Sequence, residues 1–161
     1  MCVRSHQVES MLRELAAWSD WVPLRAAAID APLLPGVYMA REDLDGPIVY
    51  VGMAGERAGG RLPQGLRGRL RVYGSGKALT SGLGEAVADR AFADPDWLAE
   101  RLREAERGEP LRAKEWGRAA FERANLYVRW AVTRDKAEAL SLERACGRVL
   151  TDAGLWNRGR F

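Results

Sequence analysis

Two short apolar runs, each with a tyrosine at its centre, place the strongest constraint on the fold. The first run covers residues 36–40 (GVYMA) and the second covers residues 48–52 (IVYVG). The polar segment 41–47 between them ends in Asp-Gly-Pro, a sequence that favours a reversal of the chain. Apolar, β-branched runs on either side of such a segment are typical of a β-hairpin, so we expect two antiparallel strands here.

The two tyrosines have predictable directions, because side chains alternate between the two faces of a strand. In the first strand, Tyr38 points away from the face that Val37 and Met39 share. In the second strand, alternation places Tyr50 on the same face as Ile48. Two tyrosines on facing strands of one hairpin can point into one site, and we expect this pair to do so.

The rest of the chain predicts helices and one further strand. Apolar residues at helical spacing indicate helices over 8–18, 66–73, 78–92, 95–107, 111–123 and about 134–150. Asp94 and Pro95 suit the cap and the first position of one of these helices, in which Leu98 and Leu102 share a face. The segment 125–133 is rich in β-branched and aromatic residues and predicts a third strand.

The composition is that of an ordinary globular domain. A chain of 161 residues, 47% of them hydrophobic and 29% charged, is long enough to form one domain with its own core. No signal-peptide pattern and no run of ~20 apolar residues is present, so we expect a cytoplasmic protein without a membrane partner. Cys2 and Cys146 are too few for a disulfide framework, and Cys146 is expected to be a core thiol. A single histidine, His6, excludes a metal site of the Cys/His type.

Positive charge is concentrated just after the hairpin. The net charge is only +3, yet residues 57–77 carry six basic side chains and no acidic one. These are Arg57, Arg61, Arg67, Arg69, Arg71 and Lys77. Such a cluster suits a phosphate backbone, whereas for each residue alone a solvated arginine-rich face is the alternative.

The same residues resemble the signature of the GIY-YIG nuclease superfamily. Gly-Val-Tyr at 36–38 and Tyr-Val-Gly at 50–52 are similar to its two tripeptides, with eleven residues between the tyrosines. The family continues with a helix that carries an arginine in a pattern like Leu-x-x-Arg-hydrophobic, and residues 66–70 (LRGRL) fit, with Arg69 as that arginine. A glutamate on a later helix and an asparagine near the end of the domain complete the pattern. Glu143 and Asn157 match them, so five motifs occur in the family's order.

The resemblance implies a fold, a reaction and a cofactor. It implies a mixed α/β (α+β) fold with a small three-stranded antiparallel sheet flanked by helices. Residues 1–161 would form one domain, with an N-terminal helical extension (1–34), a motif core (36–73 and 125–157) and a helical insertion (74–124). The activity would be that of an endonuclease that hydrolyses phosphodiester bonds of DNA with a divalent cation, Mg²⁺ or Mn²⁺. RNA as the substrate stays open.

Glu143 is singled out by its surroundings as well as by the resemblance. Its neighbours three and four residues away on a helix are small or apolar, namely Ala139, Leu140, Cys146 and Gly147. Burying a carboxylate among such residues is costly unless it is paired or binds a cation. The resemblance implies a metal ligand, and a buried salt bridge between Glu143 and an arginine is the alternative. Glu138 instead neighbours Arg134 and is expected to be an ordinary surface partner.

The resemblance implies a role for each of the other matching residues. Arg69 would contact the scissile phosphate with its planar, permanently charged head. Tyr38 or Tyr50 would orient or deprotonate the attacking water, and Arg69 and the cation would have to favour the phenolate. Tyr73, one helical turn after Arg69, is a further candidate because the family often has His or Tyr there. Asn157 is either a turn residue or a support of the site through backbone hydrogen bonds or phosphate contact.

One position departs from the family pattern. Met53 stands where members often carry a lysine, and Arg57 or Arg61 could supply that charge. The alternative function is a catalytically inactive nucleic-acid-binding module on the same fold. A purely structural interaction domain is a third, and it predicts no salt-sensitive binding of DNA. The candidate nucleic-acid contacts outside the catalytic set are Arg57, Arg61, Arg67, Arg71 and Lys77.

Overall fold

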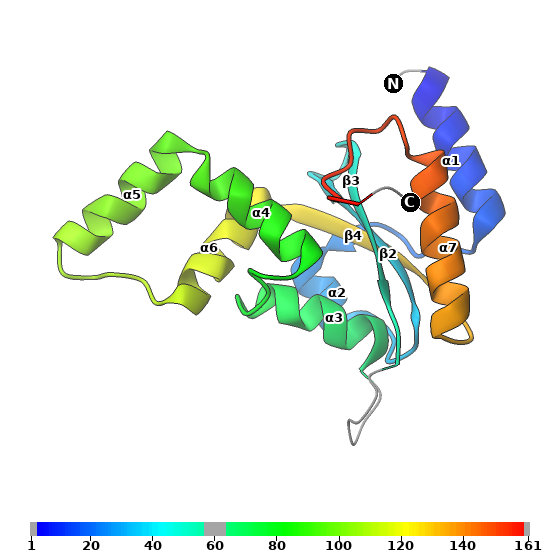
Figure 1. Ribbon diagram of the computed structural model, residues 1–161, viewed down its shortest axis with the longest axis horizontal. Coiled ribbons are helices and arrows are strands. Elements are labelled where there is room, and N and C mark those ends of the chain that lie inside the picture. The colour runs from blue at the N-terminus through cyan, green and yellow to red at the C-terminus, as the bar shows by residue number, and fades with distance from the viewer. Residues whose placement is uncertain (1–2, 57–63, 160–161) are drawn as a thin grey trace.

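The computed structural model describes residues 3–56 and 64–159, which form a mixed α/β fold as the sequence predicts (Figure 1). The elements, in chain order, are α1 (Val3–Leu15), β1 (Val22–Pro23), α2 (Leu24–Asp30), β2 (Gly36–Glu42), β3 (Ile48–Ala54), α3 (Gly65–Gly74), α4 (Gly82–Phe92), α5 (Pro95–Glu106), α6 (Ala113–Ala124), β4 (Leu126–Val132) and α7 (Lys136–Val149). None of the helices in the described ranges has both the length and the apolar character that a membrane crossing needs.

The sheet has four antiparallel strands, one more than the three that the sequence predicts. Their order is β1-β4-β2-β3, so β2 lies inside the sheet and β3 forms one edge. The additional strand, β1, consists of two residues, Val22 and Pro23, which pair with Val128 and Tyr127 of β4. Two residues are too few for an alternating pattern, so only the pairing with a distant strand defines this element. The short helix α2, which follows at once, is also absent from the prediction.

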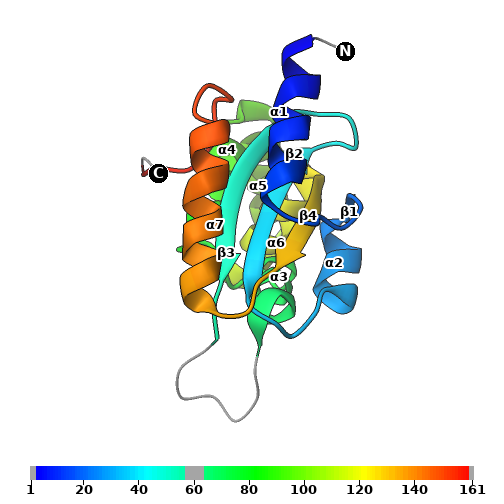
Figure 2. The ribbon, with the colours of Figure 1, turned by 90° about the vertical axis from the view of Figure 1, so that its right-hand side faces the viewer.

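Helices cover both faces of the sheet. Figure 2 shows α1 and α7 side by side across one face. Below them lies a core cluster formed by Leu12, Val37, Met39, Val51, Cys146 and Leu150. α2 and α3 cover the opposite face, over a larger cluster that includes Tyr38, Tyr50, Leu66, Leu70 and Tyr73. Alternate residues of β2 therefore serve different cores, as the strand period predicts, and the Cys146 thiol is buried as expected.

The second strand does not keep the predicted alternation. Tyr50 pairs with Ala40, but Ile48 pairs with Arg41, so Val49 is an extra residue in β3. This β-bulge shifts the side-chain period by one residue. Val49 and Tyr50 consequently both belong to the α3 side of the sheet, whereas Ile48 packs on the α1 and α7 side. The prediction that Tyr50 and Ile48 share a face is wrong for this reason.

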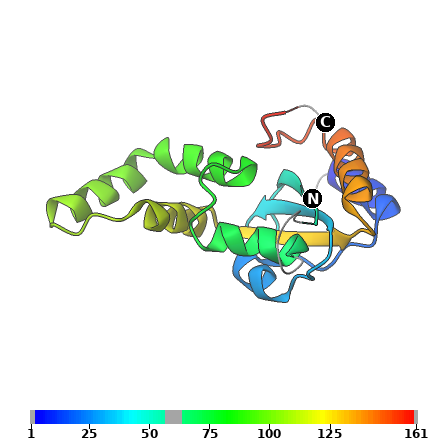
Figure 3. The ribbon, with the colours of Figure 1, turned by 60° about the horizontal axis from the view of Figure 1, so that its bottom comes forward.

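α4, α5 and α6 form an arm that projects away from the sheet (Figures 1 and 3). Its own aromatic cluster holds the arm together, because the ring centroid of Trp97 lies 5.4 Å from that of Trp116 and 6.0 Å from that of Phe92. α6 reaches back to the main core through Phe121, which stacks on Tyr73 at 5.5 Å between centroids. The arm therefore contacts the tyrosine cluster of the sheet directly.

α5 begins as predicted but packs through a different residue. The Asp94 side chain accepts hydrogen bonds from the backbone N–H groups of Asp96 and Trp97, and Pro95 occupies the first turn. Trp97 is the residue that α5 buries, whereas Leu98 and Leu102 are exposed. The predicted apolar face of this helix is therefore wrong, because a single large indole fills the contact with α4 and α6.

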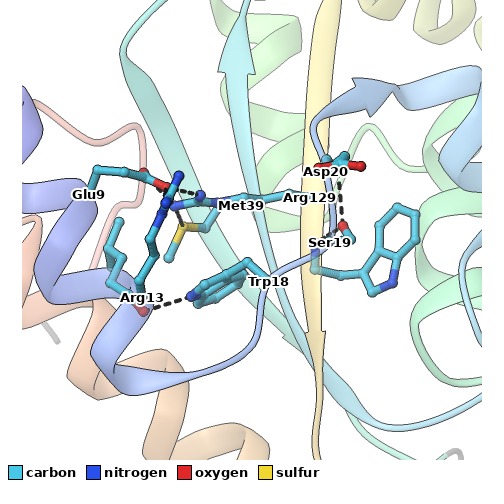
Figure 4. Close-up of polar contacts among 9 residues, drawn as sticks. Glu9, Arg13, Trp18, Ser19, Asp20, Met39 and Arg129 are labelled. Carbon is cyan, nitrogen blue, oxygen red and sulfur yellow. Dashed lines mark hydrogen bonds and ion pairs between the residues drawn. The ribbon is translucent and has the colours of Figure 1, made fainter.

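A partly buried ion pair ties α1 to the sheet (Figure 4). The two oxygens of Glu9 accept hydrogen bonds from Nη1 and Nη2 of Arg129 in β4, at 2.6 and 3.0 Å. The Arg129 side chain is almost fully buried, and its guanidinium lies over the rings of Trp18 and Trp21. Two parallel N–H···O bonds define an orientation as well as a contact, so this pair sets how α1 lies on the sheet.

Candidate active site

Tyr38 of β2, Tyr50 of β3 and Tyr73 of α3 meet on the α3 side of the sheet. The hydroxyls of Tyr38 and Tyr73 are 2.5 Å apart and hydrogen-bonded. The ring centroid of Tyr38 lies 6.1 Å from that of Tyr50 and 5.9 Å from that of Tyr73. Tyr38 pairs with Gly52 across the ladder, which makes Tyr50, two residues earlier, its diagonal neighbour on the same face. The register of the hairpin thus brings the two motif tyrosines together, as the sequence predicts.

Two glycines make room for these rings. A Cβ atom at Gly52 would lie 2.5 Å from the hydroxyl oxygen of Tyr38 and 2.6 Å from its Cζ. A Cβ atom at Gly82, the first residue of α4, would lie 2.5 Å from the hydroxyl oxygen of Tyr50. The Tyr38 ring therefore lies across the backbone of Gly52, and the Tyr50 hydroxyl reaches the start of α4. Gly52, the glycine of the second tripeptide, is therefore required for a steric reason, because any side chain there would collide with the Tyr38 ring.

The three tyrosines are buried, and their hydroxyls are protonated at neutral pH. Tyr38 and Tyr73 are 2% and 1% exposed, and Tyr50 is 8% exposed. Burial raises the pKa of all three phenols, and the neighbouring phenols add to the rise at Tyr38, whereas the charge of Arg69 lowers each pKa only in part. The expectation that Arg69 would favour a phenolate is therefore correct in sign, but burial outweighs it.

Arg69 lies on α3 at the edge of this cluster. Its charge lowers the pKa of Tyr38, Tyr50 and Tyr73 in part. α3 buries Leu66, Leu70 and Tyr73, and Arg69 stands beside that stripe with its side chain exposed. An exposed and permanently charged guanidinium next to buried phenols is well placed to meet an anion from solvent.

Glu143 of α7 approaches the outer edge of the sheet at β3. Its half-buried carboxylate accepts a hydrogen bond from the backbone N–H of Met53. Burial raises the pKa of Glu143, and the Met53 N–H and the charge of Arg144 offset part of the rise. Within residues 3–56 and 64–159, Glu143 forms no ion pair at salt-bridge distance, so the alternative of a buried salt bridge with arginine has no support there. Glu138 does pair with Arg134, at 3.1 Å, as expected for a surface residue.

Asn157 holds the C-terminal segment against the edge strand. The side chain of Asn157 accepts a hydrogen bond from the Val51 N–H at 3.1 Å through Oδ1 and donates one to the Val51 carbonyl at 2.7 Å through Nδ2. The preceding residue, Trp156, donates its backbone N–H to the carbonyl of Val49 at 2.6 Å. The side-chain amide thus pairs with the backbone of β3 as a neighbouring strand would.

A cleft of about 390 Å³ lies where α7, β3, α4 and the C-terminal segment meet. Among the predicted catalytic residues, Tyr50, Glu143 and Asn157 line it. The cleft is also lined by residues that the sequence reasoning missed, namely Gly82, Glu85, Leu140, Arg144, Arg158 and Gly159. Arg144 and Arg158 could have been suspected, since each follows a motif residue directly. Glu85 carries no such signal, because no motif falls on α4.

The predicted basic cluster is divided by the fold. Arg57 and Arg61 lie outside the described residues. Arg67 is half-buried, and its Nε donates to a backbone carbonyl at the end of α2 at 2.6 Å, so it joins α3 to α2. Arg71 and Lys77 are exposed. Of the described candidates for nucleic-acid contact, Arg71 and Lys77 keep the clearest access to a phosphate backbone.

The donor set at the cleft fits a hard divalent cation better than a zinc-type centre. In the part of the chain that the structure describes, no three His, Cys, Asp or Glu side chains gather at one place. Mg²⁺ is commonly held by one or two carboxylates, with water and substrate phosphates as its other ligands. A single half-buried carboxylate whose pKa is raised by burial suits this arrangement, because a cation would relieve the cost of its charge.

No protein-family model, no curated protein and no solved structure matches this chain. The motifs in the sequence and the geometry of the cleft are therefore the basis on which a function is proposed.

Proposed function

We propose that this protein is a divalent-metal-dependent endonuclease of the GIY-YIG type that hydrolyses phosphodiester bonds of DNA. The supporting observation is that Glu143, from α7, lines one cleft with Tyr50 and Asn157, which come from two other motifs. A half-buried carboxylate with a raised pKa beside buried phenols does not favour folding, so packing alone gives no reason for it. Perturbed ionisable groups that converge in a cleft are typical of functional sites.

Phosphodiester hydrolysis needs a positioned water, positive charge on the pentacovalent phosphorus and stabilisation of the leaving oxygen. The water oxygen forms a bond to phosphorus, and the bond from phosphorus to one sugar oxygen breaks. Glu143 would hold the cation, which when bound supplies Lewis-acid stabilisation of the phosphate oxygens. Arg69 would supply a second, permanent positive charge, because its guanidinium is exposed at the edge of the tyrosine cluster.

Tyr50 is the tyrosine we assign to the water, because it lines the cleft and Tyr38 lies behind it. Its hydroxyl is protonated in the resting protein, so its first role is to orient the water through a hydrogen bond. Tyr38 and Tyr73, whose hydroxyls bond to each other, would hold the Tyr50 ring in place. The proton that the attacking water loses would pass to solvent in the cleft, and the leaving sugar oxygen would take a proton from solvent. Of the two candidate tyrosines, we therefore choose Tyr50, because it lines the cleft and Tyr38 does not.

Cleavage of supercoiled plasmid tests this proposal. The wild type should nick or linearise DNA with Mg²⁺ or Mn²⁺ and should stop in excess chelator. Glu143→Ala should lower the rate by about 100-fold or more, since a metal ligand is lost. Glu138→Ala is the matched control, because this glutamate lies on the same helix but pairs with Arg134 at the surface. Equal activity in all three proteins would mean that Glu143 does not hold the cation, or that the activity is a contaminant.

The second candidate is a catalytically inactive nucleic-acid-binding module on the same fold. The burial of the three phenols, which raises their pKa values, favours this candidate, because none of them is prepared to act as a base. In that case the protein would bind DNA in a strongly salt-dependent way and would not cleave it with either cation. Glu143→Ala would then bind DNA at least as well as the wild type, since it removes a negative charge.

A further inference from the structure

We propose that Arg158 binds a phosphate of the substrate at this cleft, and that Glu85 and Asp89 of α4 occupy its guanidinium until the substrate replaces them. The inference rests on the proposed function, since it concerns the same cleft. It adds a binding residue that lies outside the five motifs. It also assigns two carboxylates the role of competitors for that residue.

The backbone at Arg158 is fixed beside the cleft. The preceding residue, Asn157, is held to Val51 of β3 by two hydrogen bonds. Arg158 itself lines the cleft together with Tyr50 and Glu143. Because its neighbour in the chain is anchored, the Arg158 side chain can change partners without any movement of the sheet. Its guanidinium can therefore reach a phosphate of a DNA strand that enters the cleft, next to the one that is cleaved.

The present partners of Arg158 are two carboxylates, one helical turn apart on α4. Nη1 lies 2.5 Å from an oxygen of Glu85, and Nη2 lies 2.7 Å from an oxygen of Asp89. All three side chains are exposed, by 63% for Arg158, 39% for Glu85 and 55% for Asp89. Ion pairs with this exposure contribute little to stability, so they can be exchanged at small cost. A phosphate offers the same guanidinium two oxygens in the fork geometry that arginine prefers.

If a DNA phosphate replaces Glu85 and Asp89 at the Arg158 guanidinium, substitution of the arginine and substitution of the two carboxylates should have opposite effects on DNA binding. Loss of the Arg158 charge removes a phosphate contact and weakens binding. Loss of the charges on Glu85 and Asp89 frees the guanidinium and removes repulsion of the incoming phosphates, so it strengthens binding. A purely structural latch between α4 and the C-terminal segment predicts something else, because breaking it from either side would have the same effect.

The test measures binding of a fluorescent DNA duplex to the full chain in chelator, where no metal-dependent cleavage occurs. Arg158→Gln should raise Kd about fivefold to tenfold and reduce the slope of log K against log salt by about 0.9, the value for one phosphate contact. The double variant Glu85→Gln, Asp89→Asn should lower Kd several-fold. Adding Arg158→Gln to that pair should remove most of the gain. Thermal unfolding of each variant should match the wild type, as expected for exposed positions.

The control variant is Arg123→Gln, which removes the same charge from an exposed ion pair with Asp94 on the arm. Its Kd should stay close to that of the wild type. In the cleavage assay, Arg158→Gln should raise KM and leave kcat nearly unchanged, because the residue contacts the substrate away from the reacting atoms.

Three results would overturn the inference while the proposed function stands. They are an unchanged Kd for Arg158→Gln, weaker binding by the double carboxylate variant, or loss of cleavage on Glu85→Gln in a protein that already carries Arg158→Gln. The second would indicate a structural latch, and the third would give Glu85 a direct role at the cation. Failure of the wild type to bind any duplex, even at low salt, would instead overturn the proposed function together with this inference.

Discussion

The hydroxyl of Tyr38 lies 2.5 Å from the hydroxyl of Tyr73, a residue 35 positions later in the chain. One comes from the first strand of the hairpin and the other from the last turn of α3. Both are nearly inaccessible to solvent, so each is the other's hydrogen-bond partner in the core. A buried hydroxyl that loses its partner keeps the full cost of its desolvation, which makes this pair a sensitive point for stability.

Tyr73→Phe should therefore destabilise the fold by about 1–3 kcal/mol, because the ring remains but the Tyr38 hydroxyl is left unpaired. Urea unfolding measures the change in the free energy of unfolding. Tyr127→Phe is the matched control, since Tyr127 of β4 is half-exposed. If Tyr73→Phe and Tyr127→Phe unfold at the same urea concentration, the hydrogen bond between Tyr38 and Tyr73 does not contribute to stability in the way proposed. Loss of cleavage in Tyr73→Phe with normal folding would add a role in holding the Tyr50 ring.

Gly52→Ala should disrupt the tyrosine cluster. The new Cβ would lie 2.5 Å from the Tyr38 hydroxyl oxygen, so the ring must move away from the strand. We expect a loss of about 1–3 kcal/mol in the free energy of unfolding, together with a loss of cleavage. Gly74→Ala is the comparison, because a Cβ there has no neighbour within 4 Å. That substitution should leave stability nearly unchanged, and an equal loss in both variants would contradict the steric explanation.

Asn157→Ala should free the C-terminal segment from β3. Two hydrogen bonds to Val51 are lost, and the Val51 N–H becomes open to solvent. Hydrogen exchange of the Val51 amide should become faster by at least about tenfold, which corresponds to roughly 1.4 kcal/mol of lost protection. Asn157→Asp is the informative second variant. It keeps the acceptor for the Val51 N–H but places a carboxylate oxygen against the Val51 carbonyl, so it should also be less protected than the wild type.

The pH dependence of stability should report the half-buried state of Glu143. Burial raises the pKa of Glu143 in the folded protein above its value in the unfolded chain. Between these two pKa values the folded state binds more protons, so the contribution of Glu143 to stability falls as the pH rises from about 4 towards 7. Glu143→Gln should therefore be more stable than the wild type at pH 7, and the difference should shrink towards pH 4. Glu138→Gln should behave oppositely, because a backbone N–H and the charge of Arg134 lower the pKa of Glu138. Unfolding of the three proteins at both pH values measures this.

Glu9→Gln should loosen α1. The Arg129 guanidinium would stay buried without its countercharge. Because the Glu9 side chain is one third exposed, the loss should be smaller than the roughly 3–5 kcal/mol that breaking a fully buried pair costs. Glu14→Gln on the same helix is the control, because Glu14 is exposed. Denaturant unfolding and near-ultraviolet circular dichroism of Trp18 and Trp21, which lie under the guanidinium, should change only in Glu9→Gln.

Elements with a local signal were predictable from the sequence. The hairpin, the strand β4 and the helix α7 each have a period or a cap that is independent of the rest of the fold. Asp135 shows this well, since its side chain accepts the Glu138 N–H at the start of α7, close to the predicted start of this helix at about residue 134. β1 and the bulge at Val49 were not predictable, because each exists only through pairing with a distant strand.

Three of the six predicted catalytic residues line the cleft, whereas Tyr38, Arg69 and Tyr73 are not among its lining residues. The motif residues Tyr50, Glu143 and Asn157 do line one cleft. The protonated state of the phenols was missed, because burial depends on how closely α3 and the arm pack on the sheet. Glu85 and Arg158 were missed too, since their pairing joins α4 to a segment 73 residues later and leaves no local pattern.

The position of the C-terminal segment has a consequence for solubility. β3 is an edge strand, and edge strands with free N–H and C=O groups recruit strands from other molecules. Here the backbone of Trp156 and the side-chain amide of Asn157 occupy those groups at Val49 and Val51. The C-terminal segment around Trp156 and Asn157 therefore also protects the edge of β3 from pairing with strands of other molecules. A chain shortened before Trp156 would leave these backbone groups free and become prone to aggregation.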